Sequence, residues 1–418
     1  MTFENMRGGD ASMNDTSTSP VKIAIIGVGG GGSNAVDNMI ELGVKVDQFM
    51  AINTDRQALR VSKAKRRVQI GSNITKGYGA GANPEKGRLA AEECRETLNS
   101  LIKDVDLVFI TAGMGGGTGT GAAPIIAEIA HNQGKLTVAF VTTPFKFEGD
   151  VRMRNAQMGI AKLREFVDSI IIVPNEKLAG VAKDLGMSTQ DAFKYADDIL
   201  RQGVQATTDL IMNPGKINVD FADICTVLQE GGDSIIGIGR ANGANRAIEA
   251  VKKAVNNAVL DTSIEGATRA IVNVEGKDLK MDEVSQAVAL VRDICAPDAN
   301  IIFGHGIVPA LKDEMQVTII ATGFKKPIAG AQPQQQAAQQ PARPQQNVPY
   351  GMPYGAQQQA QRPVYPGQPQ QQQAQPRPQQ QSFFNQQPQQ THRPENNGYI
   401  GLDDDNDSSW LNKLKNRR

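Results

Sequence analysis

Two pairs of side chains in this 418-residue sequence have types and spacings that could serve chemistry on a bound ligand. Asp220 and Asp223, in the segment NVDFAD, lie three residues apart at a predicted helix start, so their carboxylates can face the same way. Acids at a helix start are commonly caps, and the sequence alone favours that interpretation over a catalytic role. Phe193 and Asp197 lie four residues apart in another predicted helix. A ring there could stack on a purine while the carboxylate accepts hydrogen bonds from guanine.

Two glycine-rich segments offer backbone N–H groups to an anion. GVGGGGSN at 27–34 follows the apolar run VKIAIIGVG, and GMGGGTGTG at 113–121 follows DLVFITA. Parallel strands end at one edge of a sheet, so the two turns and the helix N-termini after them would form a cage suited to a triphosphate. Thr118 and Thr120 add hydroxyl groups. The chain has no G-x-x-x-x-G-K-[ST] motif, which excludes a P-loop.

A dinucleotide-binding enzyme is the main alternative. Gly27, Gly29 and Gly32 match G-x-G-x-x-G, and Asp55 could bind a ribose some twenty residues further on. Four consecutive glycines satisfy many patterns, however, and a nicotinamide enzyme needs only one such turn. No histidine or cysteine constellation lies near the loops. A non-hydrolysing scaffold that uses the nucleotide only for assembly is a further alternative, against which the two acids argue.

The elements that must position these residues alternate between apolar strands and helices. Strands are predicted over 21–29, 47–55, 106–113, 135–144 and 168–175, and a long helix over 188–213 that starts with a capping box formed by Ser188 and Asp191. The remaining segments to 325 predict a mixed unit of strands and helices. The expected fold class is α/β: a doubly wound Rossmann-like domain, a long central helix, a second smaller α/β domain and a disordered C-terminal tail.

Composition excludes several classes of protein. The chain has 44 basic and 44 acidic residues, so no nucleic-acid partner is expected. Cys94, Cys225 and Cys295 are too widely spaced for a disulfide framework or a zinc site. We see no secretory signal in residues 1–19 and no apolar run long enough to cross a bilayer, so we expect no direct membrane insertion.

The C-terminal quarter has a different composition. Gln and Pro dominate residues 326–395, which we predict to be a disordered linker with a root-mean-square reach of about 45 Å. Hydrophobic residues return in the last stretch, where Trp410, Leu411 and Leu414 would share one helical face. We interpret this segment as a peptide that docks on a partner, with a solubilising tail as the alternative.

Several motifs together resemble one family. GGGTGTG at 115–121 resembles the phosphate signature of the tubulin/FtsZ family of GTPases. The first glycine loop and the segments TKGYGAGANPEKG, TPFKFEG and NVDFADI are similar to the bacterial cell-division members of that family. The motifs occur in one order and cover about 21–325, together with the layout of linker and terminal peptide. The terminal segment SSWLNKLKNRR departs from the expected Pro-x-Phe-Leu-Arg-like core.

The resemblance implies a set of site residues. Contacts to the nucleotide are expected from the two glycine loops, the loop by the γ-phosphate, a ribose and phosphate pair, and three base contacts: Gly30, Gly31, Gly32, Ser33, Asn34, Gly117, Thr118, Gly119, Ala80, Gly81, Ala82, Glu148, Arg152, Asn175, Phe193 and Asp197. Helical phase favours Asp197 for guanine, with Asp198 left open. Asp220, Asp223 and Asn218 would form the catalytic group. An exposed ion pair is the simpler interpretation of Glu148 and Arg152.

The resemblance also implies a function. We expect a cytoplasmic, assembly-dependent GTPase that binds GTP or GDP with Mg²⁺, polymerises head to tail and forms the bacterial division ring at mid-cell. The expected domains are an N-terminal arm at 1–20, a GTP-binding domain at 21–187, the central helix at 188–213, a C-terminal activation domain at 214–325, the linker at 326–395 and a terminal peptide at 396–418. Through that peptide the chain would bind membrane-anchoring and regulatory division proteins.

Overall fold

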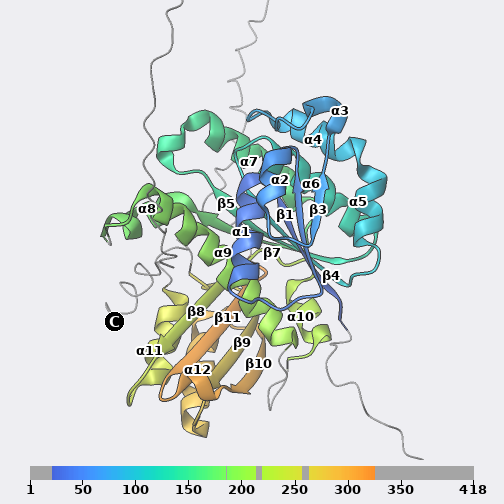
Figure 1. Ribbon diagram of the computed structural model, residues 1–418. Coiled ribbons are helices and arrows are strands. Elements are labelled where there is room, and N and C mark those ends of the chain that lie inside the picture. The colour runs from blue at the N-terminus through green and yellow to red at the C-terminus, as the bar shows by residue number, and fades with distance from the viewer. Residues whose placement is uncertain (1–20, 185, 213–218, 257–262, 325–418) are drawn as a thin grey trace, which may run out of the picture. The chain divides into compact units, whose positions relative to one another are not determined.

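The computed structural model describes residues 21–184, 186–212, 219–256 and 263–324 (Figure 1). The predicted N-terminal arm, the Gln/Pro-rich linker and the terminal peptide with Trp410, Leu411 and Leu414 lie outside the described residues, as does Asn218.

A seven-stranded parallel sheet organises the N-terminal part of the described chain, and only its last, two-residue strand comes later, at 232–233. Its strand order is β3-β2-β1-β4-β5-β6-β7. The strands are β1 (Ile23–Val28), β2 (Gln48–Asn53), β3 (Arg66–Gln69), β4 (Leu107–Gly113), β5 (Leu136–Thr143), β6 (Ser169–Pro174) and β7 (Gly232–Asp233). The order of the strands reverses between β1 and β4. In doubly wound sheets the ligand crevice lies at this switch point, outside the carboxyl ends of the strands.

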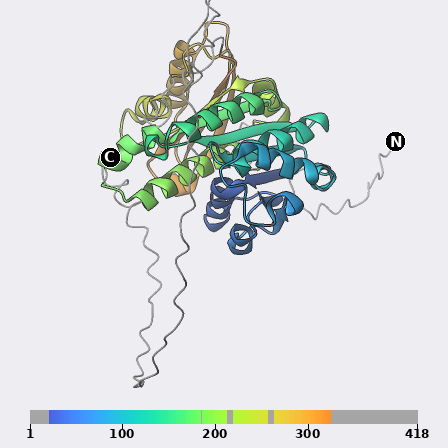
Figure 2. The same ribbon diagram turned by 90° about the horizontal axis from the view of Figure 1, so that it is seen from above.

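Helices cover both faces of this sheet (Figures 1 and 2). Side chains of β1 alternate between two cores: Ile23 and Ile25 pack with α1, α8 and α9, whereas Ala24 and Ile26 pack with α4, α5, α6 and α7. The helices in this half are α1 (Gly29–Glu41), α2 (Arg56–Val61), α3 (Ser72–Thr75), α4 (Pro84–Glu93), α5 (Arg95–Ile102), α6 (Thr118–Asn132), the 3₁₀ turn η1 (Lys146–Glu148), α7 (Asp150–Arg164), α8 (Asn175–Asp184) and α9 (Thr189–Met212).

A four-stranded sheet forms the second unit of strands and helices. Its order is β10-β9-β11-β8, in which β9 and β10 are parallel and β11 is antiparallel to both of its neighbours. The elements are α10 (Phe221–Leu228), β8 (Ile235–Ala241), α11 (Arg246–Val255), β9 (Arg269–Gly276), α12 (Met281–Ile294), β10 (Asn300–Ile307), η2 (Pro309–Leu311) and β11 (Met315–Thr322). The predicted α/β class with a second, smaller sheet is therefore confirmed.

The long central helix starts as predicted. The Ser188 hydroxyl donates to Asp191 Oδ2 at 2.7 Å and accepts from the Asp191 backbone N–H at 3.2 Å, which is the expected capping box. The first glycine loop differs from expectation, because Gly29 is already the first residue of α1. The glycines are therefore the first turn of a helix rather than a loop before one.

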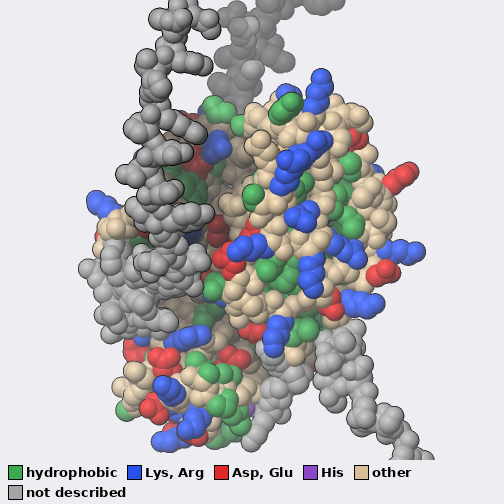
Figure 3. All heavy atoms as spheres, viewed as in Figure 1, with side chains coloured by type: hydrophobic (Ala, Val, Ile, Leu, Met, Phe, Trp, Pro, Cys, Tyr) green, Lys and Arg blue, Asp and Glu red, His purple; other side chains and the backbone are tan. Residues whose placement is uncertain are grey.

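Edge strand β3 was not predicted, because Arg66 and Arg67 are exposed and the strand lacks an apolar run. It belongs to a basic region with Arg56, Arg60, Lys63 and Lys65, and in Figure 3 Lys and Arg side chains gather over the part of the surface where α2 and β3 lie. Charged side chains on an edge strand discourage pairing with another sheet, which accounts for their presence there.

Candidate functional site

The two glycine segments lie side by side at the switch point of the large sheet. β1 runs into α1 through Gly29, and β4 runs into α6 through the segment 114–117. Because Val28 is paired with Ala112 across the two strands, the turns that follow them are neighbours. The structure therefore brings the two predicted phosphate loops to one place.

Close packing explains why glycine is needed at two of these positions. Gly29 has a φ of +74°, and a Cβ on it would lie 2.8 Å from the backbone nitrogen of Gly119. A Cβ on Gly119 would lie 2.8 Å from the carbonyl oxygen of Gly113. Side chains at either position would push the loops apart, so the bare backbones define the geometry of the site.

Both helices begin without a side-chain cap. The N-cap residues are Val28 for α1 and Gly117 for α6, neither of which makes a capping hydrogen bond, and neither helix has an acidic residue in its first turn. Two uncapped N-termini at one edge of a sheet present unpaired N–H groups and the positive ends of two helix dipoles. That arrangement favours an anion such as a phosphate group.

The predicted residues of the first loop all lie in the first two turns of α1. Gly30, Gly31 and Asn34 are exposed, whereas Gly32 and Ser33 are buried. The Ser33 hydroxyl oxygen is buried without a hydrogen-bond partner among the described residues. Since a buried polar atom normally has a partner, this hydroxyl is suited to a ligand at the loop.

Hydroxyl groups brace the second loop. Thr118 Oγ1 lies 2.7 Å from Thr54 Oγ1, and Thr120 Oγ1 accepts from the Gly115 backbone N–H at 2.8 Å. Thr120 therefore holds the loop in shape as well as carrying a hydroxyl. The sequence analysis missed Thr54, although its position directly after an apolar strand places it at the carboxyl edge of the sheet.

The loop with Ala80, Gly81 and Ala82 lies against the second glycine segment. A Cβ on Gly117 would come within 2.7 Å of the Ala80 methyl group, so the two loops are in direct contact. Ala82 has a φ of +56°, a conformation that non-glycine residues rarely adopt. The exposed residues Gly81 and Ala82 thus belong to a strained turn beside the paired glycine loops.

Glu148 and Arg152 form the ion pair that their spacing suggests. The Arg152 side chain is 46% exposed and that of Glu148 is 12% exposed. The second oxygen of Glu148 accepts from the Phe145 backbone N–H at 3.0 Å, which fixes the turn after β5. The pair therefore has a structural role at the carboxyl edge, and its predicted contacts to ribose and phosphate remain a prediction.

The residues predicted to contact the base come from α9 and from the start of α8, which follows the carboxyl end of β6. Phe193 makes an edge contact with Phe145, with ring centroids 5.0 Å apart, and lies 6.5 Å from the ring of Phe147. Phe193 still exposes 40% of its surface. Asn175 follows β6 directly, and its side-chain oxygen is buried without a partner among the described residues. An exposed ring and an unpaired buried amide oxygen are thus available to a planar polar ligand.

The two adjacent aspartates of α9 have different surroundings. Asp198 is buried; it accepts from Arg201 Nε at 2.7 Å and from Gln202 Nε2 at 2.7 Å. Asp197 makes no hydrogen bond or ion pair within the described part of the chain. Burial, and secondarily the neighbouring Asp198 charge, raise the pKa of Asp197 to about 7. The geometry favours Asp197 as the residue with an unused carboxylate.

The acidic pair lies at the opposite edge of the sheet. Asp220 and Asp223 form a reciprocal capping box at the start of α10, with Asp223 N–H donating to Asp220 Oδ1 at 2.8 Å and Asp220 N–H donating to Asp223 Oδ2 at 3.1 Å. α10 lines a cavity together with Asp106 and Asp168, which directly precede β4 and β6. The acids are therefore near the amino ends of the strands, whereas the glycine loops follow the carboxyl ends.

Asp55, the residue that could bind a ribose in a dinucleotide enzyme, has a structural partner. Asp55 Oδ1 accepts from the backbone N–H groups of Gln57 and Ala58, so this side chain caps α2. Within the described ranges no helix has the length and apolar character to cross a membrane, and no group of three or more His, Cys, Asp or Glu side chains could hold a metal ion.

The fold and these loops define a class: an α/β protein with a doubly wound sheet and two uncapped helix N-termini at its switch point. Comparison with protein families gives the family. Residues 22–183 match the GTPase domain of the Tubulin/FtsZ family, and residues 232–325 match the C-terminal domain of the FtsZ family. The chain belongs to the tubulin/FtsZ family, which decides against the nicotinamide enzyme.

Solved structures agree with this assignment. An empty FtsZ dimer from M. jannaschii is 43% identical in sequence, with a TM-score of 0.68, and the match covers 72% of this chain and 88% of that one. The GDP-bound CetZ1 monomer of Haloferax volcanii is 24% identical, with a TM-score of 0.64 and coverage of 74% and 96%. The CetZ2 protofilament of the same organism, with GTPgS bound, is 19% identical, with a TM-score of 0.62 and coverage of 73% and 94%. The last two show the fold alone.

Proposed function

We propose that this chain binds GTP at its paired glycine loops, assembles head to tail with copies of itself, and hydrolyses GTP where two copies meet. The observation that carries the proposal is the placement of its two chemical groups. The phosphate loops follow the carboxyl ends of the strands, and the acidic pair lies beside their amino ends. This placement on opposite edges of one sheet supports a site that two copies complete together.

The length of the strands gives the size of this separation. β4 contains seven residues, which corresponds to about 23 Å of extended chain. A group that orients an attacking water must lie within hydrogen-bond reach of it, about 3 Å. This separation supports a site in which the acids of a second copy, stacked along the strand direction, serve the nucleotide of the first.

Assembly follows from the same geometry. A contact between two different faces of a molecule is heterologous, and it propagates into a filament when its rotation does not close a ring. The M. jannaschii FtsZ that resembles this chain was solved as a dimer, which supports self-association. In the filament Asp220 and Asp223, with Asn218 from the preceding segment, would orient and polarise water in the site of the neighbouring copy.

Binding of the nucleotide would use the residues of the carboxyl edge. The exposed glycines of the first turn of α1, the N-terminus of α6 and the Ala80–Ala82 loop would hold the phosphates, and Glu148 with Arg152 would contact ribose and phosphate. Mg²⁺ would accompany the nucleotide phosphates, as it commonly does at nucleoside triphosphate sites.

Guanine would be read by α9 and the start of α8. Phe193 would stack on the base, Asn175 would contact its edge, and Asp197 would accept hydrogen bonds from N1–H and the 2-amino group. Adenine presents no such pair of donors, so the carboxylate selects guanine. The engagement of Asp198 by Arg201 and Gln202 supports assigning this role to Asp197.

In the cell, the filaments would form a cytoplasmic ring at the division site at mid-cell of a bacterium. The Gln/Pro-rich segment 326–395 would act as a linker, and the terminal peptide at 396–418, with Trp410, Leu411 and Leu414, would dock on membrane-anchoring and regulatory division proteins. Deleting 400–418 should abolish binding to the anchor in a pull-down and leave GTPase activity intact. Undiminished recovery of the anchor would contradict this role.

The experiment that tests the proposal is phosphate release from GTP measured against protein concentration. A site shared between copies predicts almost no turnover below a threshold concentration and a steep rise above it. A specific activity that is constant at all concentrations would show that one chain carries a complete site.

A further inference from the structure

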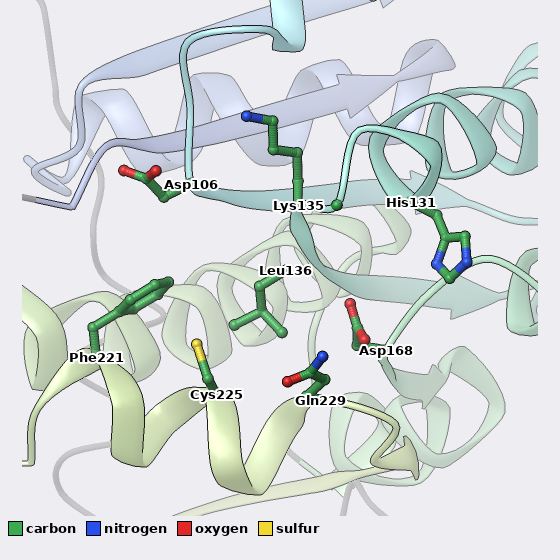
Figure 4. A pocket seen from close by; sticks show the side chains of 9 residues that line it. Asp106, His131, Lys135, Leu136, Asp168, Phe221, Cys225 and Gln229 are labelled. Atoms are coloured by element: carbon green, nitrogen blue, oxygen red, sulfur yellow. The ribbon is translucent and has the colours of Figure 1, made fainter.

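A cavity of about 330 Å³ opens at the amino edge of the large sheet, away from the nucleotide loops (Figure 4). Its apolar wall consists of Leu136, Phe221 and Cys225, which come from the start of β5 and from one face of α10. Polar side chains surround that wall: Asp106, His131, Lys135, Asp168 and Gln229. The cavity is large enough for one aromatic side chain and has polar partners for a hydroxyl group at its rim.

The cavity adjoins the acidic pair directly. Phe221 follows Asp220 in the chain, and Cys225 lies two residues after Asp223 on the same helix. Phe221 and Cys225 are four residues apart and so share a face of α10. Any molecule whose nucleotide reaches Asp220 and Asp223 must therefore bring part of its own surface against this cavity.

Tyr78, Phe147 and Phe193 are exposed aromatic residues on the surface that would arrive, and Tyr78 is the most exposed of the three. Tyr78 precedes the Ala80–Ala82 loop by two residues and exposes 88% of its surface. Its backbone is held in place, since its N–H donates to the Thr75 carbonyl at 3.0 Å and it forms an antiparallel bridge with Asp55. The exposed Phe147 packs on two other rings, whereas Tyr78 contacts no aromatic ring within the described residues.

We propose that Tyr78 of one copy inserts into this cavity of the next copy and fixes the register of the shared site. The inference rests on the head-to-tail assembly proposed above and names the contact that sets its alignment. The ring packs on Leu136, Phe221 and Cys225, and the phenol hydroxyl reaches the polar rim. Because Tyr78 is joined to the loop beside the γ-phosphate, the same contact couples that loop to the neighbouring acids.

Native Cys225 makes the contact directly testable by crosslinking. Tyr78→Cys, with Cys225 in place, should give a covalent dimer with a short bis-maleimide when GTP is present and filaments form. Burial, and then the charges of Asp168 and Asp220, raise the pKa of the Cys225 thiol, so the reaction is run at mildly alkaline pH. Tyr78→Cys/Cys225→Ser should remain uncrosslinked, as should Met281→Cys, whose position is 83% exposed on α12.

A second pair of variants covers the case in which Tyr78→Cys assembles poorly. Cys225→Trp fills the cavity and should raise the critical concentration for assembly about tenfold, with GTP binding to the monomer unchanged. Adding Tyr78→Gly should recover part of that loss, because the added ring then replaces the missing one. Filaments that form without any crosslink from position 78 to Cys225, and without coupling between the two positions, would overturn the Tyr78 contact and leave the head-to-tail proposal standing. Failure of the unmodified protein to assemble with GTP would overturn both.

Discussion

Replacing Asp197 by Asn should change which base the protein binds. Guanine donates from N1–H and from the 2-amino group, and a carboxylate accepts both. Asn offers one acceptor and one donor, so the contact to the 2-amino group becomes unfavourable. A charged hydrogen bond contributes about 1.5–3 kcal/mol, so the loss of this contact should lower GTP affinity by about 10-fold to 150-fold. Xanthine carries an oxygen at position 2, so Asp197→Asn should gain affinity for XTP.

The raised pKa of Asp197 adds a dependence on pH with a definite sign. With a pKa of about 7 in the free protein, the carboxyl is largely protonated at pH 6 and must ionise to accept from guanine. Apparent affinity for GTP should therefore fall about tenfold between pH 8 and pH 6. The Asp197→Asn variant lacks this ionisation and corrects for the titration of the phosphates themselves.

The same shift predicts a stability effect in the nucleotide-free protein. The pKa is raised from 3.8 to about 7, so the stabilising contribution is present at low pH and is lost as the pH rises through 7. Above that pH, Asp197→Asn should be more stable than the unchanged chain, by up to about 4 kcal/mol. Asp198→Asn is the matched control: it breaks the pair with Arg201, should destabilise the fold, and should leave base preference unchanged.

Isothermal titration of the monomer with GTP, XTP and ATP at pH 6 and pH 8 measures the affinities, and denaturant unfolding of the nucleotide-free variants at the same pH values measures the differences in stability. Equal losses of GTP and ATP affinity in Asp197→Asn, or the same pH dependence in the variant as in the unchanged protein, would refute the assignment of guanine recognition to Asp197.

Three other perturbations test separate parts of the structure. Asp223→Ala should keep GTP binding and filament formation but lose turnover by a factor of at least about 100, as measured by phosphate release; normal hydrolysis would show that the acidic pair is only a helix cap. Gly29→Ala should abolish GTP binding in a filter assay, because its Cβ would lie 2.8 Å from Gly119 nitrogen; unchanged affinity would mean that the loops separate without harm. Arg164→Ala removes a two-point ion pair with Asp233, at 2.8 and 3.0 Å, that joins α7 to β7; thermal unfolding should show a loss of about 1–3 kcal/mol, and a melting temperature unchanged by the substitution would contradict this.

Much of the fold could be predicted from the sequence, because the buried parallel strands are continuous apolar runs and the long helix carries its own cap. β3 could not be predicted, since an edge strand with Arg66 and Arg67 has no apolar pattern. β7 could not be predicted either, because it has only two residues, Gly232 and Asp233, and exists through its pairing with β6. Both edges depend on contacts with neighbouring strands rather than on local composition.

In the candidate site, too, some features follow from the local sequence and others depend on contacts between distant segments. Glycine runs after two apolar strands locate the paired glycine loops, since glycine content and strand pattern are local signals. The contact between Gly29 and Gly119 is tertiary, as is the difference between Asp197 and Asp198. Two adjacent carboxylates in one helix look alike in the sequence, and only the packing of Arg201 and Gln202 around α9 distinguishes them.

The central claim, that each GTPase site is divided between two copies, is tested most directly by mixing two inactive variants. Asp223→Ala keeps the glycine loops but lacks an acid, and Gly29→Ala keeps the acids but has impaired loops. Each alone should release little phosphate from GTP, and the mixture should recover hydrolysis, because an intact loop of one variant can meet intact acids of the other. Copolymers that form in the mixture but hydrolyse no faster than the two variants measured separately would contradict the divided site.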